Sequence, residues 1–500
     1  MNSLKVDWIA RAGQLTRTIR NFVGGQWVEV GGQTKTKFGP RDGLPLYEIG
    51  TSEQADIDFA VAEARASFEQ GQWPQSSPAA RKAVLKRLAD LVRAYAEELA
   101  LLESLDCGKP ISDALAVDIP TAANIIDFYA EAADKLESRV FNSDLTGLSY
   151  QLRRPYGVVA AIVGWNFPLV LAAGKLGAAL ATGNSLVLKP SELTSLSTAR
   201  VAELAIEAGV PPGAFNVVHG PGSVGSALAH HIDVDVVTFT GSTSTGKRIL
   251  VASGRSNLKR VILECGGKSP NIVFPDSPDL EGVAANIASR AFWNRGQVCT
   301  ASSRVLVHES IKNELLDMLI EITAKMAVGD PLDPATRSGA VTSREHQRKI
   351  ENYVAIGKSE GARSAFEQVV PPELPNGGFY LGATVFDDVE PDHAIAREEI
   401  FGPVLCCLSF ADEAEAVRIA NATTYGLSAV VWTKDLGRAH RVSQGLASGW
   451  TVVNATSTPK DRLSAGALPV SGHRQSGLGV EGGFEGLEEY RSRTAIQMFV

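Results

Sequence analysis

The chain has 500 residues, of which 44% are hydrophobic and 21% charged, and its formal net charge is −8. These values indicate a globular protein of roughly two to four domains and exclude a disordered chain. No run rich in Lys and Arg is present, so nucleic acid is not an expected partner. No apolar stretch typical of a secretory signal or of a membrane span occurs, so we expect a cytoplasmic protein that does not bind a membrane.

The cysteines show no pattern of metal ligands or disulfides. Five are present, at positions 107, 265, 299, 406 and 407, with no CxxC or Cys/His spacing. We therefore expect free thiols in a reducing cytosol, and no metal site. A free cysteine is usually a small buried hydrophobe, so Cys299 becomes a candidate nucleophile only through its neighbours.

The N-terminal part of the chain predicts short strands followed by helices. Residues 21–50 contain strand and turn signals, beginning with a hairpin-like segment. Helical patterns cover residues 53–136, including a helix over 81–105 that Gly108-Lys-Pro110 stops. Residues 138–152 are typical of an extended hairpin arm.

From residue 157 onward, apolar strands alternate with helices. We expect strands at 157–163, 185–189, 215–218, 234–239 and 260–264. We expect one helix at about 169–181, a second that follows the 185–189 strand and ends at 208, and a third that begins at about 244. A second half has strands at 271–274, 305–307, 404–408 and 428–432, with helices at about 279–293, 309–327, 344–358 and 412–421. Continuous apolar strands alternating with helices favour parallel sheets covered on both faces, so the fold class is α/β.

The segment from Thr238 to Lys247 runs from a strand end to a helix start and could hold a diphosphate. Gly241 allows a tight turn, and Ser242 can cap the helix N-terminus, where backbone N–H groups and the helix dipole favour anions. The segment matches neither the GxGxxG fingerprint nor a P-loop. An ordinary helix cap is therefore an equally good interpretation.

Lys189-Pro-Ser-Glu192 follows the second strand of this series, at the sheet edge where ligands bind in doubly wound folds. The Glu192 carboxylate could accept both hydroxyls of an adenosine ribose and would repel a 2′-phosphate, which favours NAD over NADP. The alternative is a solvated residue in a first helical turn.

Six motifs together resemble the aldehyde dehydrogenase superfamily, over essentially the whole chain. They are Gly164-Trp-Asn-Phe-Pro168, Lys189-Pro-Ser-Glu192, Phe239-Thr-Gly-Ser242, Leu263-Glu-Cys-Gly-Gly-Lys-Ser-Pro270, Gly296-Gln-Val-Cys-Thr-Ala301 and Glu399-Ile-Phe-Gly-Pro403. Within the superfamily, the chain is most similar to bacterial γ-glutamyl-aminobutyraldehyde and related ω-aminoaldehyde dehydrogenases.

The resemblance implies an aldehyde dehydrogenase fold with a Rossmann-like cofactor domain, an α/β catalytic domain and a β oligomerisation arm. The NAD-binding domain would comprise residues 1–137 and 153–265, the catalytic domain 266–470, and the arm and tail 138–152 and 471–500. An isolated two-stranded ribbon is marginal in water, so we expect the arm to pair with another subunit in a homodimer or homotetramer.

The resemblance also implies the chemistry. Cys299 attacks an aldehyde carbon, Asn166 and the Cys299 N–H stabilise the oxyanion, NAD takes hydride, and Glu264 activates water to hydrolyse the thioester. The implied catalytic residues are Cys299, Glu264, Asn166 and Lys175; the implied cofactor-binding residues are Trp165, Lys189, Glu192, Gly241, Ser242, Glu399 and Phe401; and the implied substrate-pocket residues are Phe167, Gly174, Trp293, Val298 and Thr300.

Taken singly, these residues have ordinary interpretations. Asn166 could be a turn residue and Glu264 a charged strand end. Cys265 should point away from Glu264, because side chains alternate along a strand, and it is interpreted as core packing together with the other three cysteines.

The chain also departs from the family pattern. Gly174, eight residues past Asn166, stands where many relatives place an aromatic that walls the aldehyde tunnel. With a longer loop at 454–469 bordering the tunnel mouth, this points away from an ω-aminoaldehyde, the other candidate substrate, and towards a bulkier substrate, aromatic or terpenoid. Two alternatives remain: a dehydrogenase that transfers the acyl group to coenzyme A, disfavoured by Glu264, and an inactive structural or binding protein.

Overall fold

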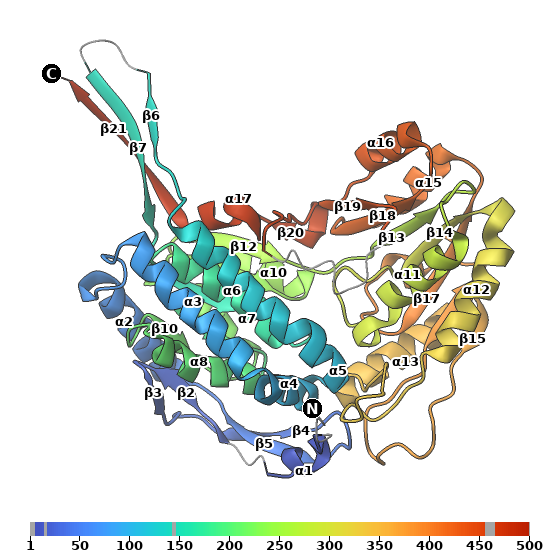
Figure 1. Ribbon diagram of the computed structural model, residues 1–500, viewed down its shortest axis with the longest axis horizontal. Helices are drawn as coiled ribbons and strands as arrows, with labels where there is room; N and C mark the ends of the chain where they lie inside the picture. Colours follow the sequence, from blue (N-terminus) through green and yellow to red (C-terminus); the bar gives the residue numbers. More distant parts are fainter. Residues whose placement is uncertain (1–5, 15–17, 143–146, 456–465, 500) are drawn as a thin grey trace, which may run out of the picture.

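Two β-sheets, each covered on both faces by helices, form the body of the protein, and a three-stranded ribbon projects from it (Figure 1). The computed structural model describes residues 6–14, 18–142, 147–455 and 466–499. The tip of the predicted hairpin arm and most of the 454–469 loop lie outside the described residues. Along the parts described, none of the helices combines the length and apolar character needed to cross a bilayer.

The first sheet has eight strands, in the order β20-β12-β11-β8-β9-β10-β2-β3. Its five central strands are parallel, as the alternating pattern predicts: β8 (Val158–Ile162), β9 (Ser185–Lys189), β10 (Phe215–Val217), β11 (Val236–Thr240) and β12 (Arg260–Glu264). Antiparallel strands complete both edges: β2 (Asn21–Val23) and β3 (Gln26–Val28), which form the expected hairpin, and β20 (Gly477–Leu478).

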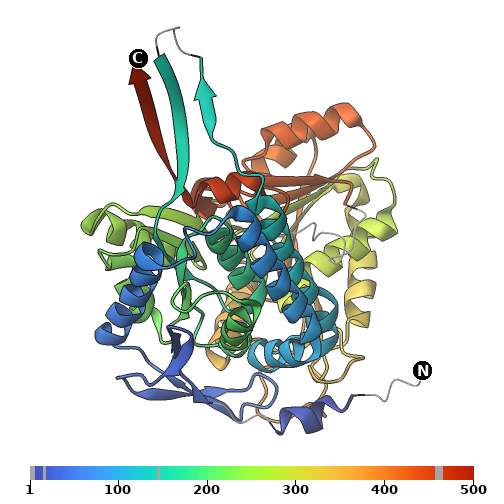
Figure 2. The same ribbon diagram turned by 60° about the vertical axis from the view of Figure 1, so that its left-hand side comes forward.

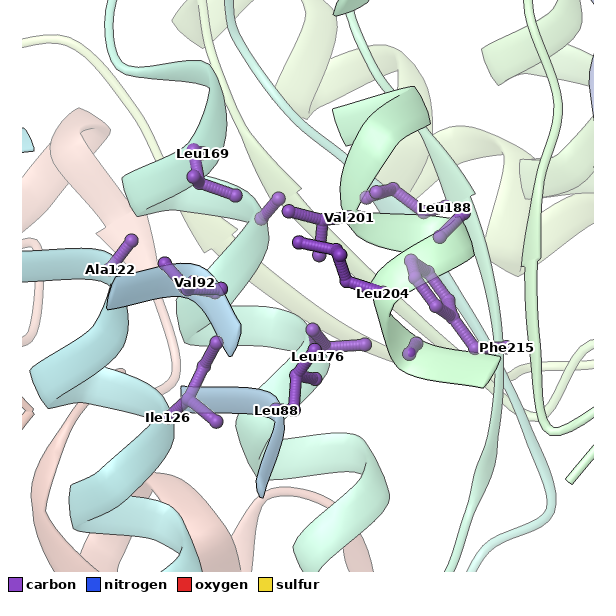
Figure 3. Close-up of a cluster of buried hydrophobic side chains, with 14 of the residues drawn as sticks. Leu88, Val92, Ala122, Ile126, Leu169, Leu176, Leu188, Val201, Leu204 and Phe215 are labelled. Carbon is purple, nitrogen blue, oxygen red and sulfur yellow. The ribbon is translucent and has the colours of Figure 1, made fainter. Parts of the chain in front are cut away.

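Side chains along each buried strand alternate between the two faces of the sheet, so the core has one layer on each face. On β8, Val159 and Ala161 pack into one cluster and Val158 and Ala160 into another. Over the first cluster lie α3 (Pro78–Ala94), α4 (Ala96–Cys107), α6 (Ile119–Ala133), α7 (Pro168–Ala181) and α8 (Leu196–Ala208), and over the second lie α2 (Gln54–Gln70), α9 (Gly222–His230) and α10 (Thr243–Arg255). Figure 3 shows the first cluster, where each buried leucine contributes about 1.5–3 kcal/mol.

The predicted helix over 81–105 is wrong in one respect, because the chain breaks it at Tyr95. This residue has φ −98° and ψ 23°, outside the helical region, and separates α3 from α4. The break redirects the chain, since α3 packs mainly on α6 whereas α4 packs on α8. The stop after α4 is as predicted: Gly108 caps it at φ +77°, a conformation that glycine adopts without strain.

The second sheet has seven strands, in the order β15-β16-β17-β14-β13-β18-β19, and all are parallel except the edge strand β15. Its strands are β13 (Pro270–Val273), β14 (Arg304–His308), β15 (Arg363–Glu367), β16 (Thr384–Asp387), β17 (Val404–Phe410), β18 (Ser428–Trp432) and β19 (Trp450–Val453). One face is covered by α11 (Leu280–Phe292) and α12 (Lys312–Lys325), and the other by α13 (Arg344–Ser359), α15 (Glu413–Ala420) and α16 (Leu436–Gly445).

The ribbon consists of β6 (Arg139–Phe141), β7 (Gly147–Pro155) and β21 (Arg491–Phe499), and stands off the body (Figure 2). The central strand β7 pairs antiparallel with both neighbours. The rest of the C-terminal segment runs along the body, because β20 pairs with β12 and the short helix α17 (Gly483–Glu488) packs on α7.

Candidate active site

Cys299 lies in a tight loop between α11 and β14. The loop begins with Asn294 and Arg295 in the left-handed region, at φ 48° and 58°, and closes with an Ala301 N–H···O=C bond to Val298 of 3.0 Å. The Cys299 side chain is half-buried. The loop packs tightly on the segment that connects β12 to β13: a Cβ at Gly267 would lie 2.5 Å from the Cys299 carbonyl oxygen, so the loop can approach only a glycine there.

Burial and two neighbouring carboxylates affect the pKa of the Cys299 thiol. Burial, together with the nearby Glu399 and Glu264, raises the pKa of this thiol to about 12, against the opposing influence of the backbone N–H groups of Thr300 and of Cys299 itself. The resting group is therefore a neutral thiol. The same backbone N–H groups are donors available to an anion formed at this position.

Asn166 lies in the loop between β8 and α7 and is buried. Its side-chain Nδ2 donates to the main-chain carbonyl of Gln297 at 2.9 Å. In return, Asn294 Nδ2 donates to the main-chain carbonyl of Asn166 at 3.1 Å. One hydrogen bond from the carboxamide of Asn166 and one to its main-chain carbonyl thus join this residue to the Cys299 loop.

Glu264 ends β12 and is buried. Burial raises the pKa of its carboxyl well above the usual range, Glu481 raises it further, and Lys175 and the Gly472 N–H lower it. Among the described residues, its Oε1 has no hydrogen-bond partner. A carboxyl with a raised pKa is a stronger base in its deprotonated form, and its free oxygen could then accept a proton.

Lys175 is buried on α7 and joins this group through Glu481. Its Nζ forms an ion pair with Glu481 and donates to Thr238 Oγ1 at 3.0 Å. Sequence reasoning missed Glu481, because it lies in a glycine-rich segment just before α17 that has no motif of its own. Only the pairing of β20 with β12 brings that segment to the site.

Glu399 and Phe401 lie in the loop before β17. Glu399 Oε1 accepts from the Gly267 N–H at 2.9 Å, and a side chain at Gly266 would collide with the same carboxylate. Burial raises the pKa of Glu399, and the Gly267 N–H is the largest opposing influence. Phe401 has φ +61°, a strained conformation for a non-glycine residue.

An aromatic cluster holds Phe401. Its ring meets Trp165 edge to face at 5.2 Å, and the ring of His346 lies 4.9 Å from Trp165. The distance from His346 Nε2 to the Phe401 carbonyl oxygen is 2.7 Å, and burial lowers the pKa of His346 to about 4, so the neutral ring donates this bond. Sequence reasoning also missed His346, since a histidine early in a helix gives no signal.

The expected adenosine-binding residues lie at one end of the first sheet. Lys189 Nζ is 3.3 Å from Glu192 Oε2. Beside Lys189, between α9 and α10, is a hollow of about 330 Å³. It is lined by Ile162, Lys189, Gly222, Gly225, Arg248 and Ile249, together with neighbouring residues of the two helices. An apolar slot next to a lysine and a carboxylate fits an adenosine: a flat base in the slot, and hydroxyls on the charged pair.

Ser242 forms the helix cap that was one of the two interpretations of its segment. Its Oγ accepts from the Thr245 N–H at the start of α10. The Gly241 N–H donates to the Glu264 carbonyl at 3.0 Å, which ties this turn to β12. The free N–H groups of the first turn still point out of the helix end, where an anion is favoured.

The expected substrate-pocket residues lie in three places. The rings of Phe167 and Trp293 lie 5.1 Å apart and are tilted by 40°, and Val298 and Thr300, both partly exposed, flank Cys299. Gly174 lies on α7, and no described atom lies within 4 Å of a Cβ placed there, so there is room for a side chain at this position.

The other cysteines are buried free thiols, as expected. Cys265 packs in the second core layer with Leu263 and Ile249. Cys107 Sγ donates to the main-chain carbonyl of Trp165 at 3.4 Å. Within the described ranges, no group of three or more His, Cys, Asp and Glu side chains is arranged to hold a metal ion.

This combination of fold and site defines an aldehyde dehydrogenase. The model of the aldehyde dehydrogenase family matches residues 27–496, and the chain belongs to that family. The predicted α/β fold of the family is confirmed, because solved structures of aldehyde dehydrogenases superpose on the chain with TM-scores of 0.95.

Particular relatives are similar over nearly their whole lengths. The NADP/NAD-dependent aldehyde dehydrogenase PuuC of Escherichia coli (strain K12) is 45% identical over 98% of this chain and 97% of its own. The aminoacetaldehyde dehydrogenase of Pseudomonas aeruginosa is 40% identical over 95% and 94%. A crystal structure of an indole-3-acetaldehyde dehydrogenase complexed with NAD+ has 45% identity and a TM-score of 0.95, and covers 99% of each chain.

Proposed function

We propose that the protein oxidises an aldehyde to the carboxylic acid, with NAD as oxidant and water as acyl acceptor, through a covalent intermediate on Cys299. The observation that carries this proposal is the convergence of Asn166, Glu264 and Glu399 on the Cys299 loop. One hydrogen bond and two electrostatic influences connect these groups to the loop. They come from three different segments of the chain.

The first step is addition of sulfur to the aldehyde. The Cys299 sulfur bonds to the carbonyl carbon, the thiol proton passes to solvent water, and the carbonyl oxygen becomes an oxyanion. The second N–H of the Asn166 amide and the Cys299 backbone N–H are donors for this oxyanion. One such donor is worth about 2.7–4 kcal/mol in the transition state.

Bound NAD supplies the hydride acceptor, which converts the thiohemiacetal carbon to a thioester. Glu264 then removes a proton from water, and the hydroxide adds to the thioester carbon. Collapse of that adduct breaks the C–S bond, releases the acid and restores the thiol. Lys175 and Glu481, which influence Glu264 in opposite senses, adjust how readily it takes this proton.

The residues of the first sheet fit the cofactor. Lys189 and Glu192 would hold the adenosine ribose beside the hollow between α9 and α10, and the turn at Gly241 and Ser242 would hold the diphosphate. Glu399 and the aromatic cluster of Trp165 and Phe401 would hold the nicotinamide ribose and ring. The carboxylate of Glu192 favours NAD over NADP, because it repels a 2′-phosphate.

For the substrate, we propose a bulky aldehyde, aromatic or terpenoid, with an ω-aminoaldehyde as second candidate. The open space at Gly174 and the adjacent rings of Phe167 and Trp293 favour an extended or aromatic group. The similarity to an indole-3-acetaldehyde dehydrogenase supports the first class, and the similarity to an aminoacetaldehyde dehydrogenase supports the second.

We further propose the division into domains given above and a homodimer or homotetramer. Each of the two large sheets would be the centre of one domain, and the ribbon of β6, β7 and β21 would pair with another subunit. The free thiols fit a cytoplasmic location. Sedimentation that shows only a monomer would contradict the role of the ribbon.

The test is NAD reduction with short, amino, aromatic and long-chain aldehydes, with and without coenzyme A. We expect turnover in water alone, and its loss in Cys299→Ala. Turnover that requires coenzyme A would indicate the acylating class. NAD binding without reduction of NAD by any aldehyde would indicate a non-catalytic protein.

A further inference from the structure

We propose that Gln297 is a positioning residue, which sets the orientation of the Asn166 carboxamide toward the oxyanion, with Asn294 as its second support. This inference rests on the proposed function, because it assigns Asn166 the role of oxyanion donor. It adds that the hydrogen bonds of Gln297 and Asn294 determine whether the N–H₂ end of the Asn166 amide faces the reacting carbonyl.

The bond from Asn166 to Gln297 fixes which end of the amide faces the Cys299 loop. A carboxamide has an N–H₂ donor at one end and an oxygen acceptor at the other. Asn166 Nδ2 donates one hydrogen to the main-chain carbonyl of Gln297 at 2.9 Å. Rotation of the amide by half a turn would place two oxygens against each other, so this carbonyl keeps the N–H₂ group in place and leaves its second hydrogen for the oxyanion.

The side chain of Gln297 holds that carbonyl in position. It is 1% exposed, its Nε2 donates to the Asn294 carbonyl at 3.0 Å, and its Oε1 accepts from the Thr342 N–H at 3.0 Å. Thr342 precedes α13, the helix that carries His346. The side chain of Gln297 therefore braces the Cys299 loop internally, through Asn294, and ties it to the segment before α13, through Thr342.

The turn that Gln297 holds is strained. Asn294 and Arg295 have φ values of 48° and 58°, a left-handed conformation that non-glycine residues other than Asn and Asp rarely adopt. Asn294 Oδ1 has no hydrogen-bond partner in the described chain, although its Nδ2 donates to the Asn166 carbonyl at 3.1 Å. The hydrogen bonds of Asn294 with Asn166 and Gln297 stabilise this turn.

The experiment begins with Gln297→Met, which keeps the length and volume of the side chain and removes both of its hydrogen bonds. Because a misplacement of about 1 Å can reduce the rate about 100-fold, we expect kcat to fall about 10- to 100-fold. The KM for NAD should stay within about twofold, since the expected adenosine-binding residues are distant in the fold.

The decisive readout is the same substitution in an Asn166→Ala background. If Gln297 acts through the Asn166 amide, the second substitution should lower kcat by less than about threefold there, because coupled residues are not additive. A purely structural role would lower kcat by the same factor in both backgrounds, which would overturn the inference.

A matched control exists in Gln368, whose side chain also bridges two backbone groups. Its Nε2 donates to the Met326 carbonyl at 3.0 Å, and its Oε1 accepts from the Ala383 N–H at 3.2 Å. Gln368→Met should lower stability to a comparable extent and leave kcat unchanged. An equal loss of kcat in this control would also overturn the inference.

A second variant covers the case in which Gln297→Met does not fold. Asn294→Gly suits the left-handed turn and removes the bond to the Asn166 carbonyl. It should lower kcat, and this loss should again disappear in the Asn166→Ala background. Unchanged turnover in Asn166→Ala alone would refute the proposed oxyanion donor, whereas a large loss there with unchanged turnover in Gln297→Met and Asn294→Gly would refute only the positioning role.

Discussion

Replacement of Gly267 by alanine should impair catalysis by moving Cys299. A Cβ at this position would lie 2.5 Å from the Cys299 carbonyl oxygen and 3.2 Å from Leu427 Cβ, whereas ordinary contacts begin at 3.4 Å. The backbone of the Cys299 loop must therefore move by about 0.9 Å, because Leu427 blocks the other direction. Overpacking of this kind costs about 1–3 kcal/mol of stability.

A shift of about 1 Å in a reacting group can reduce the rate about 100-fold, so we expect kcat of Gly267→Ala to fall by about that factor while the protein still folds. The assay is steady-state NAD reduction together with thermal unfolding. The control is Gly254→Ala in α10, where no described atom lies within 4 Å of the new Cβ. A Gly267→Ala protein with kcat within about threefold of wild type would refute the assigned contact between the segment that contains Gly267 and the Cys299 loop.

Two further predictions concern pH and substrate size. Burial raises the pKa of Cys299 to about 12 and that of Glu264 well above its usual range, and both groups act when deprotonated. Therefore kcat/KM should rise as pH increases from about 6 to 9, and a profile that falls over this interval would contradict these roles. Gly174→Phe fills open space, so it should lower kcat/KM for aromatic aldehydes at least about 10-fold while two-carbon aldehydes lose less than about twofold. Equal effects on both would show that Gly174 does not face the substrate.

Much of this fold could be predicted from local patterns. Strands such as 185–189 and 260–264 are uninterrupted apolar runs between helices, and the structure has them at those bounds. Gly108 likewise marks the end of α4, because only a left-handed cap fits there. The break at Tyr95 was not predictable, since it follows from the different packing partners of α3 and α4 and not from a breaking residue.

The residues of the site likewise divide into those that local sequence patterns predict and those that they do not. Cys299, Asn166 and Glu264 were found through motifs, each of which is continuous in sequence. Glu481 and His346 were missed because their partners, Lys175 and Phe401, are distant in sequence. Such pairs become visible only when β20 joins β12 and α13 packs beside the Cys299 loop.

The most direct test of the central claim is the mass of the protein during turnover. In Glu264→Gln, hydrolysis should be slowed while the earlier steps continue, so NAD and an aldehyde should give one NADH per site and then stall. We expect the peptide that contains Cys299 to gain the mass of one acyl group. A burst of NADH with Cys299 unmodified, or an acyl group on another residue, would contradict the account.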